Sequence, residues 1–107
     1  MSATPMSTIA VLAKIRAAAG KRAGLAEAFQ ANLREVQNEP GTLTYILHED
    51  AKEEDVLWFY EVYSDQDAFK AHGSAEWMKA LGPKLAPLMG GRPELIFLNP
   101  VAGKGLA

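Results

Sequence analysis

Four stretches of the chain have the residue pattern of β-strands, two with a two-residue period of side chains and two that are almost continuously apolar. These stretches are residues 8–16, 42–49, 56–63 and 94–99. In the first of them, Val11, Ala13 and Ile15 share one parity, which we expect to face a layer of helices. The pattern therefore predicts four strands separated by connections long enough to hold helices.

A helical period appears between the first two predicted strands. From Lys21 onward the apolar residues recur every three or four positions, and charged residues occupy the opposite side. The spacing predicts one amphipathic helix of roughly 18 residues, about 27 Å long. Glu39-Pro40-Gly41 is expected to end it, because proline disfavours the helical conformation at the preceding residue and glycine frees the turn.

Helix-start signals follow the third predicted strand. Ser64, with an acid three residues later, predicts a helix there, and Ser74 predicts the start of a second helical segment. Gly82-Pro83 is expected to interrupt that segment, and residues 84–89 to resume it briefly. Residues 50–55 are charged and predict a solvated hairpin loop.

The order strand, helix, strand, strand, helical segment, strand predicts an α+β fold of the ferredoxin-like βαββαβ type. This fold has a four-stranded antiparallel sheet with helices on one face. The stretch 56–63 is apolar on both parities apart from Glu61, and a domain of 107 residues has no second helical layer. We therefore expect a second copy of the chain to cover the bare face, giving a homodimer.

Composition narrows the classes of function. Eleven basic and thirteen acidic residues give a formal charge of −2, which does not favour a nucleic acid partner. The chain has no cysteine, so it has neither a disulfide nor a thiolate metal site. No apolar run reaches the roughly 18 residues of a membrane span, and the first twenty residues lack the pattern of a secretory signal. We expect a cytoplasmic protein with no membrane partner.

Three sequence segments resemble the antibiotic biosynthesis monooxygenase (ABM) family. They are Glu39-Pro40-Gly41 followed by Tyr45, WFYEVY at residues 58–63, and SDQDAFKAH at residues 64–72. The resemblance covers residues 8–101, preceded by a flexible segment 1–7 and followed by a tail 102–107. It implies a homodimer whose two sheets form an α+β barrel, with a separate pocket between the sheet and the helices of each subunit.

Members of this family include cofactor-free oxygenases of quinols and polyketide-like phenols, haem-degrading enzymes and an isomerase of a phosphorylated signal. The family's glutamate on the third strand matches Glu61, its tyrosine on the second strand matches Tyr45, and its helical histidine matches His72. Haem-degrading members carry an asparagine on the first strand and an iron-binding histidine beyond the position of His72. This chain has Ala13 and Gly82 at those positions, so a haem cofactor is not expected.

His72 is the candidate catalytic base, because a histidine can accept a proton from a phenol or quinol near neutral pH and return it. The alternative is a structural histidine bonded to a backbone carbonyl or to solvent. His48, beside the acidic loop, is expected to be structural or to lie at the dimer interface. Aromatic residues would form the pocket for the substrate ring or, alternatively, ordinary core. The chosen substrate-binding candidates are Tyr45, Tyr63, Phe69 and Trp77.

Glu61, the second catalytic candidate, is a carboxylate within an aromatic strand, where desolvation raises a pKa. Two roles remain open for it: orienting His72, or pairing with an arginine or lysine. Trp58 lies on the opposite parity, and we expect the face of Glu61 and Tyr63 to line the pocket.

The sequence therefore predicts a cofactor-independent monooxygenase that oxidises a small aromatic or quinol substrate with O₂. The alternatives are a non-catalytic dimeric module that binds a small ligand, and an isomerase of a phosphorylated small molecule. The isomerase requires an anion site, for which Lys14, Arg16 and Arg92 are the candidates. No dinucleotide fingerprint, phosphate loop or metal-ligand spacing appears, so neither a cofactor nor a metal is expected.

Overall fold

Four antiparallel strands form one sheet in the order β2-β3-β1-β4 in the computed structural model of the protein, which describes residues 8–105. The strands are β1 (Ile9–Arg16), β2 (Thr42–Glu49), β3 (Val56–Tyr63) and β4 (Glu94–Leu98). The predicted α+β ferredoxin-like class is confirmed. The expected flexible segment 1–7 and the last two residues of the expected tail lie outside the described residues.

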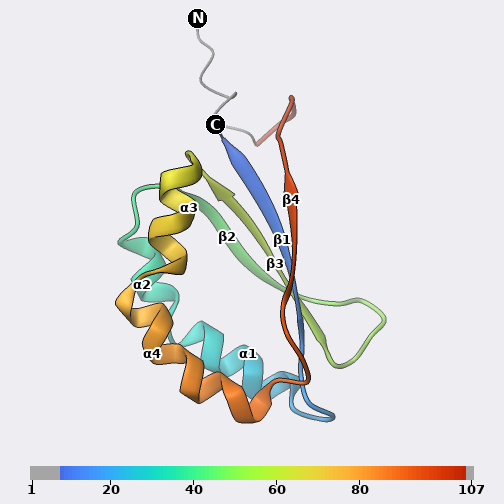
Figure 1. Cartoon of the computed structure of the whole chain (residues 1–107). Helices are drawn as coiled ribbons and strands as arrows, with labels where there is room; N and C mark the ends of the chain where they lie inside the picture. Colours follow the sequence, from blue (N-terminus) through green and yellow to red (C-terminus); the bar gives the residue numbers. More distant parts are fainter. Residues whose placement is uncertain (1–7, 106–107) are drawn as a thin grey trace, which may run out of the picture.

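All the helices lie on one face of the sheet (Figure 1). They are α1 (Arg22–Gln30), α2 (Leu33–Gln37), α3 (Gln66–Gly73) and α4 (Glu76–Leu85), followed by the short 3₁₀ helix η2 (Ala86–Leu88). In Figure 1 the yellow and orange helices α3 and α4 run one after the other along the sheet, next to α1 and α2. The helices thus form a second layer over the sheet.

The core lies between the sheet and the helices, and alternate residues of β1 and β3 contribute to it. Val11, Ala13 and Ile15 are all buried, as expected, and Ala13 pairs with Phe59 in the register of β1 and β3. Phe29 of α1 contacts Phe59 edge to face, with ring centroids 4.9 Å apart. The alternation in the sequence therefore identified the buried face correctly.

The single helix predicted from Lys21 is wrong, because the chain forms two helices separated at Ala31-Asn32. The backbone N–H of Asn32 bonds to Phe29 O, three residues back, so the turn is tighter than an α-helix. The Asn32 side chain also donates to Ala28 O at 3.4 Å. Asparagine competes in this way for backbone groups, which disfavours it inside helices.

Asp65, one residue after the predicted Ser64, caps the start of α3. Its carboxylate accepts a hydrogen bond from the Ala68 N–H at 2.8 Å. The second predicted cap is also wrong: Ala75 occupies the cap position of α4, and the Ser74 hydroxyl donates to Lys70 O instead. Both helices nevertheless begin within two residues of the predicted signals, at Gln66 and Glu76.

α4 continues through Gly82-Pro83, where the sequence predicted an interruption. Proline removes one helical hydrogen bond but leaves the turn after it intact, since the Ala86 N–H still bonds to Gly82 O. Leu81 on one side of the proline is buried, and Leu85 on the other packs against the core. Packing of these two leucines offsets the lost backbone bond.

The other face of the sheet carries large apolar side chains with no helix over them. Ile46, Tyr60, Ile96 and Leu98 share this face in the strand register, and each is 37–49% exposed. His48 and Trp58 are opposite each other on the same side. We call this surface the open face.

Candidate functional site

A cavity of about 430 Å³, which we call the inner pocket, lies between the sheet and the helices. Most of its wall is apolar, and its polar side chains are Tyr45, Glu61 and His72. The other lining residues are Ala13, Ile15, Phe29, Phe59, Phe69, Gly73, Met78, Leu85, Met89, Pro93 and Leu95. Pro93 and Leu95 are exposed, so the pocket opens beside β4.

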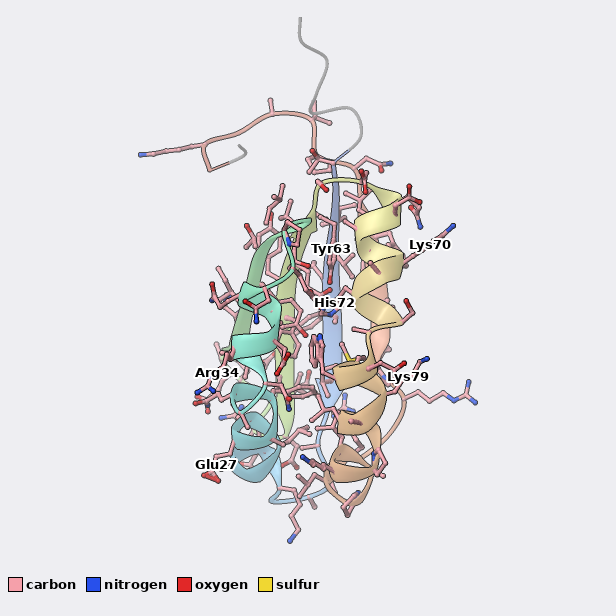
Figure 2. All side chains as sticks on the ribbon, turned by 90° about the vertical axis from the view of Figure 1, so that its left-hand side faces the viewer. Glu27, Arg34, Tyr63, Lys70, His72 and Lys79 are labelled. Carbon is pink, nitrogen blue, oxygen red and sulfur yellow. The ribbon has the colours of Figure 1, made fainter. Side chains whose placement is uncertain are left out.

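His72, near the end of α3, is almost fully buried, with 5% of its surface exposed. Figure 2 shows His72 and Tyr63 in the interior, between the pair α1 and α2 and the pair α3 and α4. The imidazole lies 5.0 Å from the Tyr45 ring and 5.5 Å from the rings of Tyr63 and Trp77, measured between centroids. Aromatic neighbours from three elements therefore fix the orientation of the ring.

The Nδ1 atom of His72 lies 2.8 Å from Oε1 of Glu39. Glu39 also accepts hydrogen bonds from the Thr42 hydroxyl at 2.8 Å and from the Trp77 indole N–H at 3.0 Å. Its carboxylate thus connects the turn before β2 with α3 and α4. Sequence reasoning used Glu39 only as a helix end, and its place in the segment Glu39-Pro40-Gly41 was the one signal that pointed to it.

A second cavity of about 380 Å³, which we call the outer hollow, lies on the far side of this contact. Glu39, His72 and Trp77 line it, together with Glu35, Asn38, Pro40, Gly41, Thr42, Ala68, Ala71 and Ala75. His72 lines both cavities, whereas Glu39 lines the outer hollow and not the inner pocket. The histidine is therefore part of the wall that separates them.

The second ring nitrogen of His72, Nε2, has no hydrogen-bond partner among residues 8–105. Within that range, no buried side-chain nitrogen or oxygen lacks a partner, so Nε2 must retain accessible surface. His72 lines the inner pocket and its Nδ1 is engaged by Glu39, so Nε2 is the ring nitrogen left for a molecule bound there. A nitrogen in this position can exchange a proton with a bound molecule.

Glu61 of β3 is 6% exposed and accepts a hydrogen bond from the Tyr63 hydroxyl at 2.5 Å. Burial raises the pKa of Glu61, and the Tyr63 hydrogen bond and nearby His72 oppose that rise. The observed partner is thus neither of the two that sequence reasoning considered. Oε2 of Glu61 has no hydrogen-bond partner in the described part of the chain. Because no buried side-chain oxygen there lacks a partner, Oε2 must retain accessible surface, as Nε2 of His72 does.

Tyr45 of β2 stacks on Phe59, with ring centroids 4.6 Å apart. Burial raises its pKa strongly, and the negative charges of Glu61 and Glu39 add to the effect. The phenol therefore stays protonated at neutral pH and remains available as a hydrogen-bond donor. Phe69 of α3 contacts Tyr63 and Phe97 edge to face, at 5.4 and 5.3 Å.

Four of the six site residues chosen from the sequence, Tyr45, Glu61, Phe69 and His72, line the inner pocket. Tyr63 is fully buried behind Glu61, and Trp77 faces the outer hollow. The chosen strand face was correct, because Glu61 and Tyr63 point to the helix side and Trp58 to the open face. The indole N–H of Trp58 donates a hydrogen bond of 2.8 Å to the Asp50 carboxylate.

Neither a metal cluster nor a membrane span emerges from the described residues. Across positions 8–105, no three His, Cys, Asp or Glu side chains gather as a metal site would require. In the same range, no helix combines the length and the apolar character needed to cross a bilayer.

The sequence profile of the antibiotic biosynthesis monooxygenase family matches residues 8–82. A crystal structure of a proposed antibiotic biosynthesis monooxygenase from Caulobacter crescentus is 34% identical in sequence, with a TM-score of 0.84, and the alignment covers 91% of this chain and 92% of that chain. A second such protein, from Chloroflexus aurantiacus, is 27% identical with a TM-score of 0.78, covering 94% and 100% of the two chains.

A conserved protein from Methanosarcina mazei shares the fold, with a TM-score of 0.81 at 19% identity over 90% of this chain and 95% of that one. No curated protein matches the chain.

Proposed function

Because the chain belongs to the antibiotic biosynthesis monooxygenase family, we propose that it is a cofactor-independent monooxygenase that oxidises a small phenol or quinol with O₂. The substrate ring occupies the inner pocket, and His72 is the general base. The cavity of about 430 Å³ falls within the usual size range of small-molecule sites.

The observation that carries the proposal is the unpaired Nε2 of His72 in a mostly apolar cavity. A base in an apolar cavity can remove the substrate's hydroxyl proton while bulk water is excluded. The electron-rich anion that results is the species able to reduce O₂. This arrangement supplies a base and a mostly apolar wall that can orient the substrate ring.

The reaction balances without an external reductant. His72 takes the O–H proton of a phenol whose para carbon carries hydrogen, and the phenolate passes one electron to O₂. The phenoxyl radical and superoxide combine at the para carbon to form a peroxide, which takes up a proton. Loss of the para hydrogen as a proton, with cleavage of the O–O bond, gives a quinone and one molecule of water.

The other polar groups of the pocket have distinct roles in this proposal. Burial raises the pKa of Glu61, so it retains its proton to higher pH than an exposed glutamate does and, when protonated, can donate it to the peroxide oxygen. The Tyr45 phenol donates a hydrogen bond to the developing oxygen anion, and Phe69 contacts the ring. Tyr63 and Trp77 act indirectly, because they hold Glu61 and Glu39.

The charges around the pocket favour this function over isomerisation of a phosphorylated molecule. No lysine or arginine lines the inner pocket within the described residues. Lys14 and Arg16 pair with Glu53, at 3.7 and 3.6 Å. A phosphate group would therefore enter a mostly apolar pocket that lacks a cation to bind it.

We also propose that the active form is a homodimer. The open face carries Ile46 of β2, Tyr60 of β3, and Ile96 and Leu98 of β4, and each of them is exposed in the single chain. Contiguous apolar surface of this kind favours association, and a second copy offers an identical surface for a two-fold contact.

Oxygen uptake with a panel of phenols and quinols tests the enzymatic proposal. The wild type should consume one O₂ per substrate, and ¹⁸O₂ should label both the quinone and the water. His72→Gln should lower kcat by about 10²- to 10⁴-fold, whereas the control variant Glu27→Gln, an exposed change on α1, should keep wild-type activity. Ligand binding without turnover would instead identify a non-catalytic binding module.

A further inference from the structure

We propose that Glu39 is a positioning residue that makes His72 a base: it holds the imidazole in the tautomer with the proton on Nδ1 and leaves Nε2 free for the substrate. This inference rests on the proposed function for its catalytic meaning. The tautomer itself is a property of the resting protein and can be measured separately.

The hydrogen bonds around Glu39 define its role. Thr42 and Trp77 donate hydrogen bonds to its two oxygens at 2.8 and 3.0 Å, and Nδ1 of His72 lies 2.8 Å from one of them. The Thr42 and His72 contacts meet at Oε1, and Trp77 binds Oε2. An ionised carboxylate has only acceptor sites, so Nδ1 of His72 must be the donor in this contact. In the neutral imidazole, Nε2 then carries no proton and can accept one from the substrate.

The backbone holds this contact in place across 33 residues of sequence. Gly41, two residues after Glu39, packs so closely on α3 that an added Cβ would lie 2.5 Å from the Cβ of Ala68. The Ser64 N–H also donates to Gly41 O at 2.9 Å. The turn carrying Glu39 is therefore fixed against the helix that carries His72.

Glu61, the other carboxylate near His72, does not replace Glu39 in this role. Its hydrogen bond is made to the Tyr63 hydroxyl, and burial raises its pKa, which favours its neutral form. Glu61 also lines the inner pocket and not the outer hollow that Glu39 lines. Only Glu39 contacts Nδ1 in the described chain.

The outer hollow provides a means of testing this role. Glu39 and His72 both line it, and its volume of about 380 Å³ is ample for a formate ion. If the Glu39 side chain is removed, a small carboxylate from solution can reach Nδ1 through this hollow. Rescue by formate thus distinguishes a carboxylate that acts on His72 from one that only stabilises the fold.

The experiment compares wild type, Glu39→Ala and Glu39→Gln, with Glu35→Gln as a matched control, since Glu35 lines the same hollow and makes no hydrogen bond to His72. ¹⁵N NMR of the neutral imidazole should show the proton on Nδ1 of His72 in the wild type and Glu35→Gln. In both Glu39 variants the proton should lie on Nε2 of His72 instead, because the carboxylate that holds it on Nδ1 is gone. Thermal unfolding verifies that each variant is folded.

Turnover is measured on the same proteins. We expect kcat to fall by about 10²-fold or more in both Glu39 variants, with KM little changed, and formate to restore part of it in Glu39→Ala only. A wild-type proton on Nε2, or Glu39 variants with unchanged kcat, would overturn the inference. A wild type that turns over no phenol would overturn the proposed function instead, and NMR would still decide whether Glu39 sets the tautomer.

Discussion

The hydroxyl of Tyr63 donates a hydrogen bond of 2.5 Å to Glu61, two residues earlier on the same strand, and both side chains are buried. Residues i and i+2 of a strand lie on one face, so the pair is local in sequence. The burial of the pair depends on distant parts of the chain, because the helices that cover this face exclude water from both groups. Burial raises the pKa of each of them.

The raised pKa of Glu61 predicts a loss of stability as pH rises. Its folded pKa is above the unfolded value, so the protonated form favours folding. This contribution is complete below the ordinary pKa of 4.5 and is lost as pH rises through the folded value. Each unit of difference corresponds to about 1.4 kcal/mol.

Glu61→Gln removes this titration and keeps an oxygen that can accept from Tyr63. Urea unfolding at a series of pH values should show the wild type losing stability relative to the variant as pH increases from 4.5. A constant difference between the two proteins across that range would contradict the raised pKa.

Asp50 predicts the opposite pH dependence. Its carboxylate accepts hydrogen bonds from the N–H groups of Glu53 and Lys52 and from the Trp58 indole, which lower its pKa from 3.8 to about 2. The ionised form favours folding, so its contribution is present above pH 3.8 and is lost as pH falls through about 2.

Asp50→Asn should therefore reduce stability at neutral pH and flatten the loss of stability in acid, as measured by urea unfolding. The matched control is Glu54→Gln, an exposed change in the same loop, which should leave the acid profile unchanged. An acid profile of Asp50→Asn identical to that of the wild type would contradict the role of these hydrogen bonds.

Gly41→Ala should destabilise the fold by about 1–3 kcal/mol, because the new Cβ overlaps the backbone-attached Cβ of Ala68 and one of the two segments must move. Gly82→Ala is the control. Its Cβ meets no atom within 4 Å, and alanine in a helix interior is worth about 0.5–1 kcal/mol more than glycine. Equal midpoints of denaturation for the two variants would show that the contact at Gly41 is not restrictive.

The open face predicts that one charge on it dissociates the proposed homodimer. Ile46→Lys should shift the protein from dimer to monomer in sedimentation velocity, since a lysine buried in an apolar contact is costly. Leu43→Lys is a matched control: the two residues share β2 and are 47% and 49% exposed, but Leu43 borders α2 on the helix side. A monomeric wild type, or dissociation by Leu43→Lys alone, would contradict the assignment of the interface.

Sequence reasoning succeeded where the signal is periodic. Alternation assigned Val11, Ala13 and Ile15 to the buried face, and parity separated Glu61 and Tyr63 from Trp58 without deciding which of the two faces lines the pocket. It failed at Asn32 and Pro83, where one residue decides between breaking a helix and continuing it. Neighbouring packing settles such cases, as Leu81 and Leu85 do for α4, and it is not visible in a local pattern.

The sequence by itself determined the order of the strands and which residues of each strand share a face, because these follow from the period of side chains along one element; His72 was singled out by the family resemblance. Only the tertiary structure decided the partner of that histidine. Glu39 and His72 are 33 residues apart and meet because the turn at Gly41 packs on α3. The periodicity of apolar residues indicates which face of an element a side chain occupies, whereas a hydrogen bond between distant elements depends on how those elements pack.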